Sequence, residues 1–117
     1  MKTTRRDALK GALAVPAVAA VPTAAWARGG KAVLVHDPAL AAGRRLAAVH
    51  DGEVLPIAGD RIRFARALFA RQPSLVVGMT RSADALLIEE VAREAGYLPV
   101  VAPASLGASG WVLAPRT

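Results

Sequence analysis

One stretch, residues 73–96, most constrains the fold of this 117-residue chain. Its uninterrupted apolar run at 75–77 is typical of a strand that is covered on both faces. Polar and small residues break the run at 78–82, and apolar residues then recur at helical spacing up to Gly96, which is a natural left-handed stop. We therefore expect a strand, a tight turn and an amphipathic helix, which is the repeating unit of an α/β protein.

The helix of this unit combines apolar rows with a charged face. The apolar rows are Ala83, Leu87, Val91 and Ala95, and beside them Asp84, Ile88 and Ala92. The charged face contains Glu89, Glu90, Arg93 and Glu94. Glu89 and Arg93 form an i,i+4 pair in the favourable orientation, with the acid N-terminal to the base. We expect the apolar rows to pack on the sheet and the charged face to meet water.

Four further segments are typical of strands. They are residues 32–36, 53–58, 97–102 and 111–114. Because Pro56 cannot donate to a strand ladder, the strand at 53–58 is expected at a sheet edge. The small-residue loop at 103–110 is too short for a helical crossover, so the last two strands are expected to pair antiparallel.

Two more helices are predicted between these strands. Asp37 and Pro38 are typical of an N-cap and a first helical residue. The apolar face of the helix that they open is Ala39, Ala42, Leu46 and Val49. Gly43 inside this helix costs about 1 kcal/mol relative to Ala, and we interpret it as a point of close packing on the sheet. Asp60 precedes the third helix, at 61–71, whose expected buried row is Ile62, Ala65 and Phe69.

Alternating strands and helices predict the α/β class. We expect a small doubly wound sheet, flavodoxin-like or Rossmann-like, with helices on both faces in three layers. It would have about four parallel strands, a C-terminal antiparallel strand and three helices. Residues 28–117 are expected to form this one small domain, after a removable leader.

The leader is residues 1–27. A basic start is followed by the uncharged stretch 11–27, which ends in Ala25-Trp26-Ala27. A charged region, an apolar region and an A-x-A cleavage site are the parts of a secretory signal peptide. The apolar stretch is short for a membrane span, contains two prolines and is rich in alanine, which is only weakly apolar, so we favour a cleavable signal over an anchor. No stable membrane span is expected after cleavage.

The start of the leader resembles the twin-arginine translocation motif, Ser/Thr-Arg-Arg-x-Phe-Leu-Lys. The matching residues are Thr4, Arg5, Arg6, Leu9 and Lys10. Ala8 stands where that family often has Phe. The resemblance covers only the signal and implies transport across the membrane in the folded state. Cargo of this route often carries a cofactor or travels with a cofactor-bearing partner.

Composition excludes several classes of function. The chain has no cysteine, so it has no disulfide, thiolate metal site, iron–sulfur cluster or cysteine nucleophile. Its net charge is +6, but the leader holds four basic residues and one acidic residue, which leaves 11 basic and eight acidic residues in 28–117. Those arginines are dispersed and aromatic residues are few, so we expect no nucleic-acid partner.

Candidate binding residues follow the strands of the predicted sheet. In open α/β sheets, ligands bind outside the carboxyl ends of the strands. The residues expected on this rim are His36, Asp37, Asp60, Thr80, Arg81 and Ser82. Backbone N–H groups at the start of the helix, together with Arg81, are suited to a carboxylate or phosphate. The alternative is structural, with Asp37 and either Thr80 or Ser82 acting as helix caps.

No catalytic signature accompanies these residues. The chain has no G-x-G-x-x-G after the first strand, no Walker loop and no G-x-S-x-G elbow. Two histidines are too few for a His-rich metal site, and His50 is interpreted as structural. A Ser82–His36–Asp60 arrangement has no motif to support it. We expect no catalytic residue, no metal site and no cofactor.

These observations predict an exported, periplasmic protein that acts as a non-catalytic accessory or binding protein. Secretion beyond the periplasm is the alternative location. One alternative function is a small-molecule or anion binder, or a small enzyme, that uses the strand-end rim. Another is a small subunit that is escorted with a larger exported redox enzyme. The expected partners are the twin-arginine export machinery and a larger exported protein.

Overall fold

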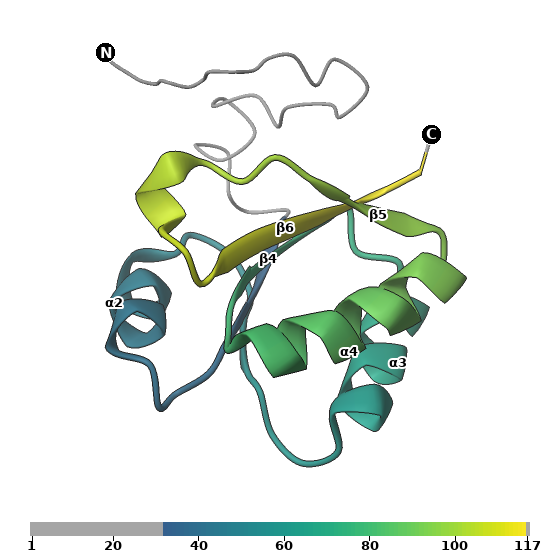
Figure 1. Ribbon diagram of the computed structural model, residues 1–117, viewed down its shortest axis with the longest axis horizontal. Helices are drawn as coiled ribbons and strands as arrows, with labels where there is room; N and C mark the ends of the chain where they lie inside the picture. Colours follow the sequence, from purple (N-terminus) through teal and green to yellow (C-terminus); the bar gives the residue numbers. More distant parts are fainter. Residues whose placement is uncertain (1–31, 117) are drawn as a thin grey trace.

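The computed structural model describes residues 32–116, in which five strands form one mixed sheet and three α-helices pack against it (Figure 1). In chain order the elements are β2 (Ala32–His36), α2 (Ala41–Val49), β3 (Val54–Pro56), α3 (Arg61–Ala70), β4 (Leu75–Met79), α4 (Ser82–Glu94), β5 (Tyr97–Val100), the short 3-10 helix η3 (Ala104–Leu106) and β6 (Gly110–Pro115). The α/β class predicted from the sequence is confirmed.

The order of strands across the sheet is β3-β2-β4-β6-β5. Strand β2 pairs in parallel with β3 on one side and with β4 on the other. Strand β6 pairs antiparallel with both β4 and β5. The edge position of β3 and the antiparallel pairing of the last two strands were both predicted and are confirmed. The insertion of β6 between β4 and β5 was not predicted.

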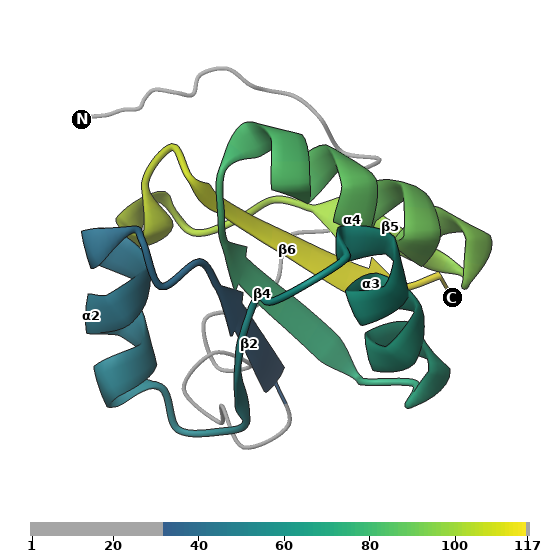
Figure 2. The same cartoon turned by 90° about the horizontal axis from the view of Figure 1, so that it is seen from below.

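The two faces of the sheet have different covers (Figures 1 and 2). Helices α3 and α4 lie on one face and contact each other, and the larger core cluster lies beneath them. Helix α2 lies on the other face, over a smaller cluster that contains Ala32, Leu34 and Val77. Successive strand residues point to opposite faces of the sheet. Val33 and Val35 therefore point toward α3 and α4, while Leu34 and His36 point toward α2.

The core beneath α3 and α4 contains the aromatic contact between Phe69 and Tyr97, whose ring centroids are 4.8 Å apart. The Tyr97 hydroxyl donates a 2.6 Å hydrogen bond to the carbonyl of Pro73, which satisfies the polar end of this buried ring. The predicted buried face of α3 is confirmed, with Ala65 and Phe69 fully buried. Ile62, in the same row, is partly buried.

The buried face of helix α4 agrees with the prediction in part. Its buried residues are Ile88, Val91 and Ala92, which all belong to the predicted apolar rows. Leu87 is 42% exposed and Ala83 and Ala95 are also exposed, so these three residues were wrongly assigned to the buried face. The Asp84 row is the more buried one because an ion pair satisfies the Asp84 carboxylate at the edge of the core. The predicted ion pair between Glu89 and Arg93 is present at 3.0 Å.

Helix α2 starts later than the sequence predicted. The Asp37 carboxylate accepts a hydrogen bond from the Ala39 backbone N–H, which holds a turn, and the N-cap position falls on Leu40 without any side-chain cap. The prediction of Asp37 as an N-cap is therefore wrong. Val49, assigned to the apolar face, is 76% exposed.

The predicted close packing at Gly43 is confirmed. A Cβ atom at this position would lie 3.2 Å from the Cβ of His36 and 3.5 Å from the Cβ of Met79. The absence of a side chain therefore lets α2 approach the ends of β2 and β4.

Within residues 32–116 no helix has the length and apolar content needed to cross a membrane. The predicted signal peptide, with Arg5, Arg6 and the cleavage residues Ala25 and Ala27, lies outside the described residues.

Candidate functional site

The candidate site lies at the carboxyl ends of β2 and β4. The strand order reverses here, because the chain after β2 returns to one side of β2 and the chain after β3 returns to the other. The connecting helices α2 and α3 leave on opposite faces of the sheet, as Figure 2 shows. Segments that diverge in this way create the crevice in which open α/β sheets bind their ligands.

Thr80, the residue after β4, is 1% exposed and holds two parts of the molecule together. Its hydroxyl accepts a 2.9 Å hydrogen bond from Nε1 of Trp111, at the start of β6. Its backbone N–H donates to the carbonyl of Ser109. Thr80 therefore joins β4 to the loop before β6 and does not cap α4.

The start of α4 has no side-chain cap. Ser82 is the first helical residue, and the N-cap position belongs to Arg81, whose side chain makes no capping hydrogen bond. The interpretation of Ser82 or Thr80 as a cap is therefore wrong. Because the first backbone N–H groups of a helix have no partner within it, those of α4 stay available at this edge.

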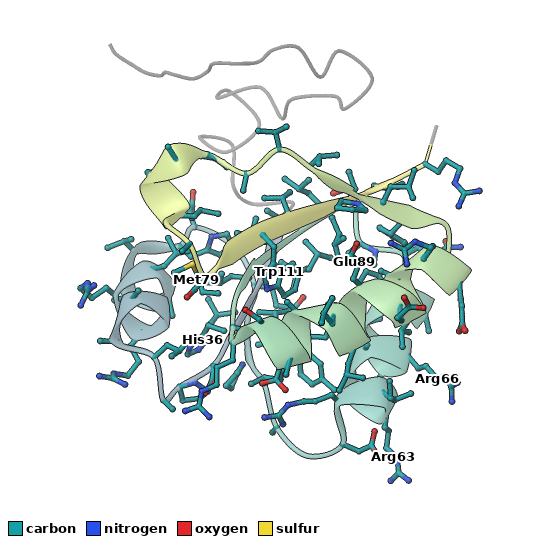
Figure 3. The ribbon with its side chains drawn as sticks, in the orientation of Figure 1. His36, Arg63, Arg66, Met79, Glu89 and Trp111 are labelled. Atoms are coloured by element: carbon teal, nitrogen blue, oxygen red, sulfur yellow. The ribbon has the colours of Figure 1, made fainter. Side chains whose placement is uncertain are left out.

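Trp111 is half-buried and its indole ring lies against the backbone of β4 at Gly78 (Figure 3). A Cβ atom on Gly78 would lie 2.0 Å from two ring atoms, so only glycine leaves room for the ring. Gly78 and Trp111 are also directly paired in the sheet. Gly78 was predicted to lie in the break after the strand, but it belongs to β4, and its contact with Trp111 was not predicted.

A shallow hollow opens beside Trp111, between the start of α4 and the start of β6. Its volume is about 290 Å³. Its lining residues are Thr80, Ser82, Ala85, Leu86, Ala108, Ser109, Gly110 and Trp111. Leu86 on its rim is 65% exposed, and the neighbouring Leu87 is 42% exposed. This surface combines apolar side chains with the hydroxyls of Ser82 and Ser109.

Charged groups on the rim form pairs with each other. Nε of Arg81 lies 3.6 Å from Oδ2 of Asp37, although the Arg81 side chain is 65% exposed. Arg61, at the start of α3, donates a 3.1 Å hydrogen bond to Asp84 in the first turn of α4. The first pair joins the residues that follow β2 and β4 and offsets part of the positive charge of Arg81, and the second joins α3 to α4.

Asp60 is the N-cap of α3. Its carboxylate accepts a 2.9 Å hydrogen bond from the backbone N–H of Arg63, and this bond lowers the pKa of Asp60 below its usual value. Of the three α-helices in the described residues, only α3 therefore has a side-chain N-cap.

His36 is turned toward α2. The residue is 8% exposed, and its Nδ1 atom is buried without a hydrogen-bond partner. A catalytic base needs an orienting partner on this nitrogen, and neither Asp60 nor Asp37 supplies one. The other histidine, His50, contacts the backbone oxygen of Ala32 at 3.0 Å, which fits its predicted structural role.

The structure brings together Asp37, Thr80 and Arg81 among the predicted rim residues. Ser82 lies beside them at the start of α4, whereas Asp60 caps another helix and His36 serves the opposite face. Four further residues of this region were not predicted as parts of it: Arg61, Asp84, Leu86 and Trp111. Their proximity depends on strand order and helix rotation, which no local pattern revealed.

No protein-family model matches this chain, and comparisons with curated proteins and with solved structures find no match. The function is therefore inferred from the residues and their geometry.

Proposed function

We propose that this protein is an exported, non-catalytic accessory protein that binds a partner protein through one side of α4. The observation that carries the proposal is the exposure of Leu86 (65%) and Leu87 (42%) beside the hollow at Trp111. Large apolar side chains that gather on a surface next to a depression are typical of interaction sites. We call Leu86, Leu87 and the hollow the α4 surface.

The rim residues support a binding role over a catalytic one. Thr80 is engaged with Trp111, Asp60 with the first turn of α3, and Asp37 with the turn before α2. A nucleophile and a base within hydrogen-bond distance of each other are the minimum for nucleophilic catalysis. Ser82 and His36 form no hydrogen bond with each other in the described part of the chain.

Export is the second part of the proposal. Its support is the signal-like leader at 1–27 and the likeness of residues 4–10 to the twin-arginine motif. The proposed location is the periplasm. The twin-arginine resemblance favours a larger exported protein as the partner, with an exported redox enzyme as one candidate class.

The proposed location is tested by replacing both arginines of the motif with lysine, Arg5→Lys with Arg6→Lys. Fractionation should find the precursor in the cytoplasm for the double variant and the processed protein in the periplasm for the wild type. Normal periplasmic delivery of the double variant would contradict the twin-arginine assignment.

Partner binding is tested with Leu86→Glu and a matched control. The control is Val49→Glu, since Val49 is an apolar residue of similar exposure (76%) on α2, remote in sequence from the α4 surface. The tagged full chain is cross-linked in its own compartment, and each cross-linked protein is then purified and titrated with the wild type and both variants. Leu86→Glu places a charge in the apolar contact, so it should weaken the binding of a true partner at least about tenfold.

The Val49→Glu control should bind such a partner as tightly as the wild type. A partner that binds all three proteins equally would place the interface elsewhere and reject the α4 surface. Circular dichroism of each variant confirms that both substitutions leave the fold intact, as expected for exposed positions.

A second candidate is an anion site at Thr80-Arg81-Ser82. The observation that favours it is the uncapped first turn of α4 next to the exposed Arg81. Calorimetric titration with phosphate, sulfate and small carboxylates tests it. Arg81→Ala should weaken binding at least about tenfold, and Asp37→Asn should strengthen it by removing the carboxylate 3.6 Å from Arg81. No binding by the wild type at millimolar concentration rejects this candidate.

We also propose that the fold is a reduced doubly wound sheet of the flavodoxin-like kind. The reversal of strand order at β2 supports it, and the antiparallel β6 between β4 and β5 is the departure from that pattern.

A further inference from the structure

His36 and Met79 are neighbours across the sheet. They are the last residues of β2 and β4, and they are directly paired in the parallel register. Their Cβ atoms lie 3.2 Å and 3.5 Å from one point, the position that a Cβ on Gly43 would occupy. Both side chains therefore start from the same small space beneath α2, where Figure 3 shows them.

Both side chains are buried, and one has an unused ligand atom. Met79 is 3% exposed and His36 is 8% exposed. Nδ1 of His36 has no hydrogen-bond partner, which is unusual because buried polar atoms nearly always have one. The fold itself therefore gives the Nδ1 atom no bonding partner. A ligand that accepts electron density from nitrogen would be such a partner.

The chemistry of the pair points to a soft metal ion. The thioether of methionine selects Cu(I), and neutral imidazole is also a good copper ligand. Cu(I) and Ag(I) accept two ligands in a linear arrangement, so a nitrogen and a sulfur are enough to hold either ion. Among residues 32–116 no group of three or more His, Asp or Glu side chains is placed to hold a metal, which excludes the usual sites for harder cations.

We propose that Nδ1 of His36 and Sδ of Met79 form a binding site for a soft monovalent cation, Cu(I) or Ag(I), beneath α2. The site needs no cysteine, and the chain contains none. It lies on the opposite face of the sheet from α4 and does not depend on the proposed partner binding. No metal site was predicted from the sequence, because two histidines are too few for a histidine-rich site and the pairing of His36 with Met79 depends on the sheet register.

Access to the site requires movement of α2. This helix has no side-chain N-cap, and the described part of it buries only Gly43 fully against the sheet. Elements with few buried apolar contacts open locally at low free-energy cost. We therefore expect slow metal entry that is coupled to the opening of α2, and greater protection of the α2 backbone amides once metal is bound.

The test is an anaerobic titration of the full chain with Cu(I) in competition with a chromophoric chelator. The wild type should bind one Cu(I) per chain. Met79→Leu preserves volume and apolar character, so it should fold normally but bind Cu(I) at least about tenfold more weakly. Met79→Cys should restore or exceed the wild-type affinity, since a thiolate is a stronger soft ligand than a thioether.

The matched control is His50→Gln, which changes the only other histidine of the chain. This variant should retain its Cu(I) binding. X-ray absorption of the copper complex should show one sulfur ligand in the wild type and none in Met79→Leu, which still contains Met1. Unchanged affinity in Met79→Leu, loss of binding in His50→Gln, or the absence of stoichiometric binding by the wild type would each overturn the proposal.

Discussion

The two faces of the sheet are formed by the same strands but are covered by very different sets of helices. On one face, α3 and α4 pack on each other and on the strands, around Phe69, Ile88 and Tyr97. On the other face, a single nine-residue helix, α2, approaches through Gly43 and contributes the half-buried Leu46. Strand residues are fully buried on both faces, as Val76 and Val77 show.

The difference teaches that apolar strands do not reveal which face carries the stability of the domain. The face under α3 and α4 buries long side chains on both the helices and the strands, so it removes more apolar surface from water. The α2 face relies on close approach at Gly43 rather than on large side chains. We therefore expect it to be the weaker face and the one that opens first.

The largest expected effect comes from a charge at the centre of the stronger face. Val76 is 0% exposed within the larger core, so Val76→Asp should leave no folded population, because it buries an unpaired carboxylate. Circular dichroism and chemical denaturation measure this. Glu90→Ala, on the exposed side of α4, should change the free energy of unfolding by no more than about 0.5 kcal/mol. Similar effects of the two substitutions would contradict the assigned faces.

Truncation of one apolar residue on each face compares them directly. Ile88→Ala removes a fully buried side chain beneath α4 and should lower the free energy of unfolding by about 2–5 kcal/mol. Leu46→Ala removes a half-buried side chain of α2 and should cost roughly 1 kcal/mol. Equal losses in urea denaturation would show that α2 supports the sheet as strongly as α4 does.

Adding a methyl group at a glycine on each face sharpens the comparison. Gly78→Ala places a Cβ 2.0 Å from the Trp111 ring, and the displacement should cost about 1–3 kcal/mol. Gly43→Ala gains about 1 kcal/mol of helix propensity and meets His36 Cβ at 3.2 Å, so the two effects should nearly cancel. Thermal melts of both variants test this, and a loss at Gly43 as large as that at Gly78 would mean that α2 cannot move outward.

A smaller effect than that at Gly78 concerns Tyr97, whose pKa is raised by burial above the usual value of 10.0. The unfolded chain loses this proton at lower pH than the folded chain, so the contribution of Tyr97 to stability is complete below pH 10 and falls as pH rises above it. Tyr97→Phe should cost about 0.5–1.5 kcal/mol at neutral pH by removing the bond to Pro73.

The same Tyr97→Phe variant should also lack the alkaline loss. Denaturation of both proteins between neutral pH and strongly alkaline pH measures the difference between them. An identical alkaline loss in the two proteins would assign that loss to other groups.

Local patterns in the sequence predict most elements but not their neighbours. The first strand, Ala32–His36, agrees to the residue because its apolar run ends abruptly at Asp37 and Pro38. The buried face of α4 was predicted only in part, because Val91 and Ile88 are buried as expected whereas Leu87 is exposed. Asp84, in the second row, forms an ion pair with Arg61 of α3. That ion pair joins residues 23 positions apart, so it becomes visible only in the folded chain.

The candidate site was predicted in part for the same reason. The carboxyl ends of β2 and β4 meet by a general rule of α/β sheets, which brought Asp37, Thr80 and Arg81 to one rim. Trp111 reaches Thr80 only because β6 lies beside β4. A chain in which β6 joined the outer edge of the sheet instead would have the same local patterns.

The position of β6 also has a consequence for the nascent chain. β4 and β5 are both synthesised before residues 110–115, yet the only sheet neighbour that β5 has among the described strands is β6. As the chain leaves the ribosome, β4 keeps an open edge and β5 has no ladder to join until those last residues emerge. The sheet is therefore completed late, when β6 inserts between β4 and β5, which are already synthesised. A translocase that accepts only folded cargo would therefore reject chains that end before residue 110, because they lack β6.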